Sequence, residues 1–271
     1  MSKLIVTANG INHLNELLKK NIDGVILYID KLSVNGSFYI KEYELNKINF
    51  NDKEVFVCIN KIMHNSDLPL IDKLLNDIKD KNYKILFYDM AVYNIAKKYN
   101  LVDKLIIYQD HLNANSVSNN FYYDLGIKGS YINNDITKDE LDLIKKNSEC
   151  FIMYTVYGYI PIFYSRRYLI TNYLKYIEKE KTDKNYFIKD EESSYPIKEE
   201  EYGTTVYTKK EINLLNHLNE LNNIDYLVLH SNLISDIEFN KIVDRFINKE
   251  SIKDEYIGFY STKTIFKVKG E

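Results

Sequence analysis

Eight short apolar segments recur along this chain of 271 residues and limit its possible folds to very few. Each is nearly continuous in Ile, Val, Leu and Tyr, as expected of strands that are buried on both faces of a parallel sheet. The segments cover residues 4–8, 24–29, 54–60, 84–89, 104–109, 129–134, 150–158 and 225–231. Helical patterns separate most of them. Eight strand–helix units in about 250 residues favour an α/β fold of the (β/α)8, TIM-like type over an open doubly wound sheet.

The same pattern predicts one barrel domain over residues 1–271, with a charged insertion at 176–207 between the seventh and eighth strands. Most of this insertion is highly charged, because residues 178–201 contain nine acidic residues and five lysines. Further helices are expected over 168–179 and 209–223. A helix is also expected from Thr137, because Thr-x-x-Glu is the form of a capping box.

Composition excludes several classes of protein. A chain that is 45% hydrophobic and 14% aromatic is not disordered. No apolar run approaches the roughly 18 residues of a membrane span, and residues 1–10 lack the features of a secretory signal. We therefore expect a cytoplasmic protein without a membrane partner. The net charge of −3 gives no overall attraction to nucleic acid.

Polar residues follow several of the predicted strands. Asn60, Asp89 and Asn113 come at or just after the ends of the third, fourth and fifth strands. Tyr157 lies near the end of the seventh. Because active sites of such barrels collect at the carboxyl ends of the strands, we expect these four side chains to bind a ligand.

Histidines and cysteines give weaker signals. His111 and His230 lie just past the fifth and eighth strands and are candidates for acid–base chemistry, whereas His13 and His217 fall in helical patterns and are expected at the surface. No histidine pair has the spacing of a metal site. The two cysteines lie at opposite ends of their predicted strands, so neither a metal site nor a disulfide is expected.

Residues 149–174 carry the most informative pattern. A long apolar strand leads through Tyr157 to Ser165, Arg166 and Arg167, and then to a helix. The chain has 36 basic residues, and three of them are arginines. Since the planar guanidinium matches carboxylates and phosphates better than a lysine does, the adjacent arginines predict a site for such an anion near the barrel mouth.

This stretch resembles the core of the peptidase U32 family of collagenase-like proteases. Glu149-Cys150-Phe151 resembles the opening of a family strand, and the run from Ser165 to Leu169 resembles its arginine-containing helix start. Asp89, Asn113 and Gly203-Thr204-Thr205 fit family segments in the same order. The resemblance extends over about residues 1–235 and implies the barrel fold.

The departures from the family pattern concern its chemistry. Many members carry four cysteines, which bind an iron–sulfur cluster in the hydroxylating members. Tyr157 and Arg167 stand near two of those positions, and no cysteine follows Cys150. Since such a cluster needs about four thiolates, we expect no cofactor in this chain and a cluster only in a partner.

Cluster-less members of this family often act with a cluster-bearing relative. The resemblance thus implies an accessory or partner subunit in hydroxylation of the tRNA wobble uridine to 5-hydroxyuridine. A cluster-bearing U32 relative, tRNA and a small carboxylate metabolite are then the expected partners. Two alternatives remain open: a U32-type peptidase using Ser165, His111 or His230, and a non-catalytic barrel that binds or scaffolds.

Overall fold

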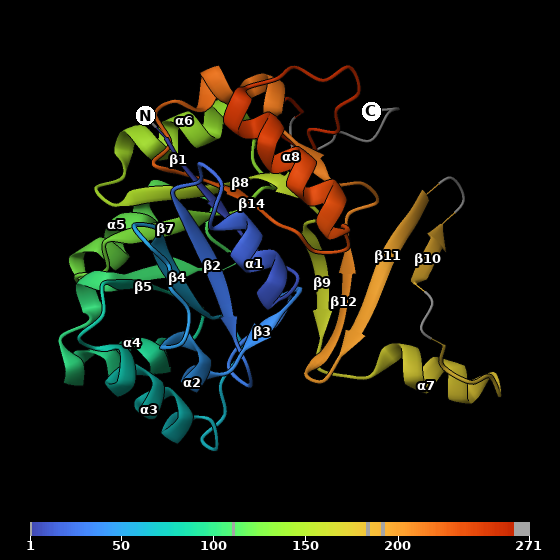
Figure 1. Cartoon of the computed structure of the whole chain (residues 1–271), viewed down its shortest axis with the longest axis horizontal. Helices are drawn as coiled ribbons and strands as arrows, with labels where there is room; N and C mark the ends of the chain where they lie inside the picture. The colour runs from blue at the N-terminus through green and yellow to red at the C-terminus, as the bar shows by residue number, and fades with distance from the viewer. Residues whose placement is uncertain (1, 110–111, 183–184, 191–192, 263–271) are drawn as a thin grey trace, which may run out of the picture.

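A computed structural model describes residues 2–109, 112–182, 185–190 and 193–262. Eight parallel strands form a closed barrel, because β1 pairs with both β2 and β14 (Figure 1). They are β1 (Lys3–Val6), β2 (Gly24–Ile29), β4 (Glu54–Ile59), β5 (Tyr83–Phe87), β6 (Leu105–Tyr108), β7 (Gly129–Ile132), β8 (Phe151–Gly158) and β14 (Tyr226–Leu229). None of the eight extends beyond its predicted segment by more than one residue, so the TIM-like barrel is confirmed.

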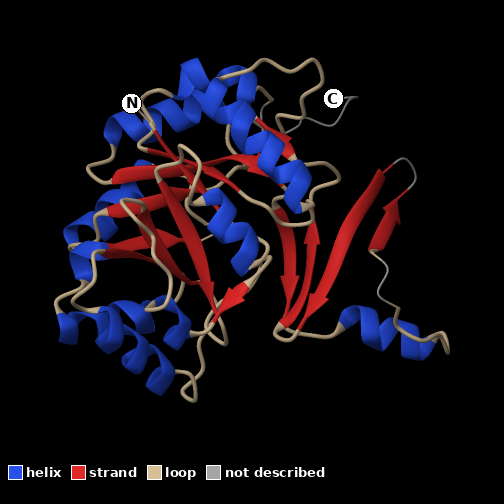
Figure 2. Cartoon of the chain, in the orientation of Figure 1, coloured by secondary structure: helices blue, strands red, loops and turns tan. Residues whose placement is uncertain are grey.

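Helices cover the outside of the barrel (Figure 2). They are α1 (Ile11–Leu17), α2 (Glu42–Leu45), α3 (Leu68–Ile78), α4 (Met90–Ala96), α5 (Ser116–Asp124), α6 (Lys138–Asn147) and α8 (Asp236–Asn248). Thr137 and Glu140 form the predicted capping box at α6. None of the helices in the described part of the chain has the length and apolar character that crossing a bilayer requires.

The prediction of a helix over 209–223 is wrong in part. β13 (Ile212–Asn213) instead pairs antiparallel with β8, and a 3₁₀ helix spans Leu215–Leu221. The side chain of Asn213 accepts a hydrogen bond from the Leu215 backbone N–H at 3.1 Å, so the turn starts only after the strand. Smaller elements elsewhere are β3 (Tyr39–Ile40) and the 3₁₀ helices η1 (Lys97–Tyr99) and η2 (Val102–Lys104).

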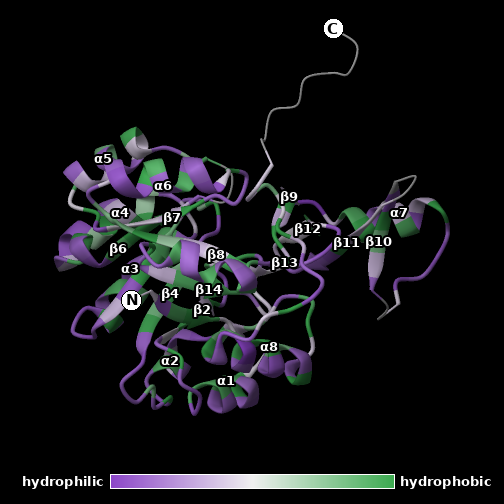
Figure 3. Ribbon diagram, turned by 90° about the horizontal axis from the view of Figure 1, so that it is seen from above, coloured by the Kyte–Doolittle hydropathy of each residue, from purple (hydrophilic) through white to green (hydrophobic). Residues whose placement is uncertain are grey.

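A second, antiparallel sheet stands beside the barrel (Figures 1 and 3). In the chain, its strands come between β8 and β13. It contains β9 (Pro161–Ser165), β10 (Tyr186–Asp190), β11 (Ser193–Glu200) and β12 (Gly203–Tyr207), in the order β10-β11-β12-β9, with α7 (Leu169–Tyr176) after β9. The predicted bounds of the insertion, 176–207, cover only part of this sheet. Two hydrogen bonds tie it to the barrel, from Thr205 Oγ1 to Asn35 Oδ1 at 2.6 Å and from the Tyr39 hydroxyl to Glu200 at 2.8 Å.

The alternation of side chains along the barrel strands creates two apolar layers. One layer fills the barrel, and the other lies between the strands and the helices. At the amino-terminal end of the barrel, Glu54 accepts hydrogen bonds from Lys3, Lys84 and the Tyr226 hydroxyl. Burial raises the pKa of Glu54, but the hydrogen bonds from the two lysines outweigh it and leave that pKa below its ordinary value. The floor of the barrel is therefore an ionic cluster.

Phe56 tests the contribution of the inner layer to stability. Its side chain is fully buried in the barrel and packs edge-on against Tyr226, with ring centroids 5.3 Å apart. We expect Phe56→Ala to lower the free energy of unfolding by about 3–5 kcal/mol, because the closed barrel cannot collapse around the lost ring. Urea unfolding measures this. Phe121→Ala, at a ring that is 60% exposed, is the control and should change it by less than about 0.5 kcal/mol. Equal losses in the two variants would contradict the role of the inner layer.

Candidate functional site

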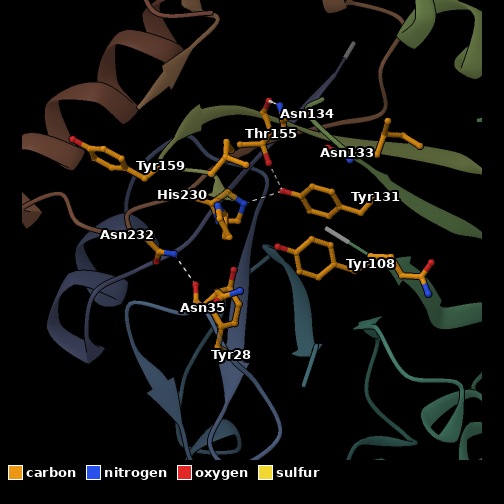
Figure 4. A pocket seen from close by; sticks show the side chains of 14 residues that line it. Tyr28, Asn35, Tyr108, Tyr131, Asn133, Asn134, Thr155, Tyr159, His230 and Asn232 are labelled. Carbon is orange, nitrogen blue, oxygen red and sulfur yellow. Dashed lines mark hydrogen bonds between the residues drawn. The ribbon is translucent and has the colours of Figure 1, made fainter. Parts of the chain in front are cut away.

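A narrow cavity opens at the carboxyl end of the barrel (Figure 4). The space inside it is about 30 Å³, and about 460 Å³ when the open mouth is included. Aromatic rings form much of its wall, from Tyr28, Tyr108, Tyr131, Tyr159 and His230. This is the end of a (β/α)8 barrel at which binding and catalytic residues gather.

Strand alternation places these rings. Tyr28 and Tyr108 follow the inward-facing Ile26 and Ile106 by two residues, and His230 follows the inward-facing Val228 in the same way. Because successive side chains of a strand point to opposite faces, each of these residues also faces the barrel interior. The rings therefore form the last inward layer, directly above the apolar filling of the barrel.

A chain of hydrogen bonds joins three of the lining residues. The Tyr131 hydroxyl is 2.9 Å from His230 Nε2 and 2.8 Å from Thr155 Oγ1. The Tyr108 and Tyr131 rings lie beside each other with centroids 4.5 Å apart, and Figure 4 shows their hydroxyl ends directed towards His230. The chain fixes the orientation of both the tyrosine and the imidazole.

His230 is buried and electrically neutral at ordinary pH. Burial lowers the pKa of His230 to about 4, because no water is available to solvate the imidazolium. Its Nδ1 atom is also buried and has no hydrogen-bond partner within the described residues. A buried polar atom without a partner is unusual in a folded protein.

Gly158 lets the backbone of His230 come close to β8. A Cβ atom on Gly158 would lie 2.7 Å from the His230 carbonyl oxygen, and its φ of +126° is one that residues with side chains rarely adopt. The His230 backbone N–H donates to the Tyr157 carbonyl at 2.8 Å. Glycine at this position therefore allows the backbone of His230 to lie directly against β8.

Side-chain amides surround the cavity, contributed by Asn35, Gln109, Asn133, Asn134 and Asn232. Several are held in place: Asn232 Nδ2 donates to the Asn35 carbonyl at 2.6 Å, and Asn134 Nδ2 donates to the Thr155 carbonyl at 2.9 Å. No residue among the described lining of the cavity is Asp, Glu, Lys or Arg. The site thus offers hydrogen bonds and aromatic surface, and no formal charge within the described part of its wall.

Three of the predicted ligand-binding residues form hydrogen bonds within the barrel and its loops and do not line the cavity. Asn60 binds both backbone groups of Val34, and Asp89 caps α4 while accepting from the Met63 backbone N–H. Asn113 is buried and donates to the Tyr131 carbonyl at 3.2 Å. None of the three lines the cavity, although Asn113 contacts one of its residues.

A β-bulge turns Tyr157 away from the cavity. Strict alternation from Met153 and Thr155 would direct Tyr157 inward, but the register against β14 shifts at this point. Tyr157 instead packs between the barrel and α8, with its ring centroid 6.3 Å from that of Phe239 and 6.1 Å from that of Phe246. Its side chain is therefore part of the outer apolar layer.

The arginine pair lies at the far end of β9, outside the cavity. Arg166 and Arg167 are both exposed, and neither lines the cavity. A guanidinium N–H of Arg166 hydrogen-bonds to His64 in the loop after β4. Ser165 Oγ accepts from the Arg167 backbone N–H at 3.3 Å. Two histidines were also predicted at the site. His230 lies in the cavity wall, and His111 lies outside the described residues.

Sequence reasoning missed the tyrosines of the site and misjudged one histidine. Tyr28, Tyr108 and Tyr131 were counted with the apolar runs, although their positions two residues after inward-facing residues mark them as the top layer. His13 is not at the surface as expected: it is buried under α8, where burial lowers its pKa and its Nδ1 accepts from the Asn9 backbone N–H. It packs edge-on against Phe239 because α1 turns that face towards α8.

The cysteines do not form a cluster site. Cys58 faces the barrel interior from β4, while Cys150 lies just before β8 in the outer layer, where burial raises the pKa of its thiol to about 11. Within the described residues, no group of three or more His, Cys, Asp or Glu side chains could hold a metal ion. The chain's two thiols do not fit an iron–sulfur cluster, which needs about four.

Fold and site together define a (β/α)8-barrel protein with an aromatic, amide-lined cavity at the carboxyl end of its strands. The model of peptidase family U32 matches residues 9–246, so the chain belongs to that family. It is also similar to the tRNA hydroxylation protein P2 of Bacillus subtilis (strain 168), with 28% identity over 177 residues. That match covers 62% of this chain and 57% of the relative, so the chain spans little more than half of the relative's length.

The buried His230 makes the stability of the protein depend on pH. Its pKa is about 4 in the folded state against 6.5 in the unfolded chain, so the unfolded chain binds more protons between these values. Stability is therefore full above pH 6.5 and falls as the pH drops towards 4. From this group alone the loss is about 3 kcal/mol.

Urea unfolding at pH 7 and pH 4 measures this contribution. His230→Asn should lose about 3 kcal/mol less than the parent between the two pH values, because the variant has no imidazole to protonate. Tyr173→Phe, at an exposed position on α7, should lose as much as the parent. An unchanged pH dependence in His230→Asn would show that this imidazole is not held neutral by the fold.

Proposed function

We propose that this chain is an accessory subunit in the hydroxylation of the tRNA wobble uridine to 5-hydroxyuridine, and that it acts with a cluster-bearing U32 relative. The observation that carries the proposal is its membership of family U32 together with its similarity to a protein named for tRNA hydroxylation. The relative's name points to tRNA as the object of the chemistry. The cytoplasm, where tRNA is found, is the proposed location.

The number and placement of the cysteines support a role in which a partner subunit carries the redox chemistry. Hydroxylation of a pyrimidine is a redox reaction, and the family's hydroxylating members use an iron–sulfur cluster for it. Cys58 and Cys150 lie in different apolar layers and are both buried, so they do not fit such a cluster. The redox chemistry would then come from a four-cysteine relative, and this chain would contribute binding surface.

The charge distribution also supports joint binding of tRNA. A net charge of −3 gives little attraction to a polyanion. Arg166 lies five residues beyond Pro161, which lines the cavity, and this is about 16 Å along an extended strand. In the proposed complex, the exposed arginine pair would hold a phosphate of the RNA backbone, or a small carboxylate, outside the cavity.

The geometry gives the peptidase alternative no support among the described residues. A serine nucleophile needs a base within hydrogen-bond reach. Ser165 lies on β9 and accepts a hydrogen bond from a backbone N–H, whereas His230 lies in the barrel cavity and bonds to Tyr131.

Deletion of the gene in its native host tests the role. We expect 5-hydroxyuridine to disappear from the tRNA, as measured by mass spectrometry of digested nucleosides, and to return when the parent chain is supplied. A tagged copy of the chain should co-purify with a four-cysteine U32 protein. Unchanged 5-hydroxyuridine after deletion would overturn the proposal.

The arginine pair provides a sharper test in the same assay. Replacement of both Arg166 and Arg167 by Ala should reduce tRNA binding by the subunit pair about tenfold, because two phosphate contacts are lost. The matched control replaces Lys209 and Lys210, another exposed and adjacent basic pair, by Ala. Equal effects of the two double variants would show that only overall charge matters.

A further inference from the structure

We propose that the antiparallel sheet beside the barrel, together with α7, is the surface on which the cluster-bearing partner subunit docks, and that the partner meets it with an apolar patch surrounded by positive charge. This inference rests on the role in tRNA hydroxylation proposed above and adds to it the place and the chemistry of the contact. Three features carry it: exposed apolar side chains, the outer edge of the sheet and a concentration of negative charge.

Large apolar side chains are exposed to solvent on this sheet and on α7. Each of the following is at least 45% exposed: Ile162, Phe163, Tyr173, Tyr176, Phe187 and Ile188. Single exposed apolar residues are common on any protein, but a group of them on one small sheet and its helix marks an interaction surface. Aromatic residues are also enriched in protein interfaces.

The pairing register arranges apolar side chains in a row across one face of the sheet. Phe163 of β9 lies opposite Val206 of β12. Val206 lies opposite Ile197 of β11, which in turn lies opposite Tyr186 of β10. Residues directly opposite each other in a sheet have their side chains on the same face. Ile188, two residues after Tyr186, belongs to this face as well. The face is therefore apolar across all four strands.

A groove connects this sheet with the barrel mouth. The space inside it is about 400 Å³, and its walls include Tyr186 and Ile197 of the sheet, Ile170 of α7, and Tyr159 and Leu233 on the barrel side. Tyr159 also lines the cavity at the carboxyl end of the barrel. A subunit that docks in the groove would therefore lie beside the cavity, where the proposed redox chemistry of the partner is needed.

The strand β10 forms the outer edge of the sheet. Among the described strands it pairs with β11 alone, and it lies farther from the barrel than β11 does (Figures 1 and 3). Natural proteins usually cover or blunt such an edge, because its backbone groups can pair with another chain. Phe187 and Ile188 on β10 are nevertheless 50% and 45% exposed. A partner can extend the sheet here by adding a strand.

Charge favours a different subunit over a second copy of this chain. Residues 178–201 contain both β10 and β11 and hold nine acidic residues and five lysines, whereas the net charge of the whole chain is −3. Two copies would bring like charges together at this sheet, whereas a positively charged partner is attracted to it. Such a partner would also supply the attraction to tRNA that this chain lacks.

Calorimetric titration of the full-length chain with the purified four-cysteine U32 relative of the same host tests the proposal. The double variant Phe163→Ser/Ile188→Ser removes two half-exposed apolar side chains and should weaken binding at least about tenfold, because buried apolar anchors carry much of the energy of an interface. The matched control is Val117→Ser/Phe121→Ser, at two exposed apolar positions of α5, and should bind as the parent does. Circular dichroism and Tm establish that each variant is folded. Parental affinity in the sheet variant, or an equal loss in the control, would overturn the proposal.

Charge variants test the same surface without changing its apolar side chains. Glu178→Gln/Glu180→Gln, at exposed positions after α7, should slow association with the partner about threefold at low ionic strength, and less at high ionic strength. Asp77→Asn/Asp80→Asn, at exposed positions at the end of α3, is the matched control. Equal rates in the two double variants would contradict a positively charged partner at the sheet.

Sedimentation of the isolated chain distinguishes a second copy from the proposed partner. We expect a monomer, because the acidic segment repels its own kind. A dimer that Phe163→Ser/Ile188→Ser converts to monomers would show that a second copy occupies the sheet, and would overturn the proposal.

The docking test and the deletion test fail separately. If deletion abolishes 5-hydroxyuridine but the sheet variant binds the partner as the parent does, the role in hydroxylation stands and the docking surface is wrong. If the sheet variant loses the partner but deletion leaves 5-hydroxyuridine unchanged, the docking surface stands and the role in hydroxylation is wrong.

Discussion

Closure of the barrel is the constraint on which the other features depend. Because β1 pairs with both β2 and β14, all eight strands have two neighbours, and the inner and outer faces of every strand are defined. Alternation then fixes which side chains point inward, except where the bulge in β8 shifts it. Apolar residues fill the lower part of the barrel, and aromatic rings with polar ends form the top layer. The cavity is thus the upper end of the barrel core.

The fold could be predicted from the sequence because parallel strands buried on both faces leave continuous apolar runs. The site could be predicted only in part. Tyr28 and Tyr108 belong to such runs, and composition alone does not separate a ring at the cavity from a ring in the core. Tyr157 was expected near the ligand, but one bulge in β8 reverses its direction. A bulge changes pairing without any clear signal in a single sequence.

The arginine pair shows a second limit of sequence reasoning. Adjacent arginines after a long apolar strand were expected near the barrel mouth, on the assumption that the chain continues from the strand into a barrel helix. The chain instead enters β9, which pairs with β12 in a separate sheet, and Arg166 contacts His64 in the loop after β4 rather than the cavity. This pairing joins residues about 40 positions apart, such as Phe163 and Val206, and local periodicity carries no information on it.

The separation of charge from the cavity has a consequence for how RNA would be held. A cavity with amides, aromatic rings and a neutral imidazole supplies little binding energy for a polyanion. The exposed Arg166 and Arg167 lie instead at the end of β9, five and six residues along the chain from Pro161 of the cavity wall, and the net charge of the chain is negative. In the proposed role, contact with the RNA backbone and contact with the cavity would therefore belong to different surfaces. Much of the affinity would then come from the proposed partner subunit, which agrees with a barrel whose thiols do not fit an iron–sulfur cluster.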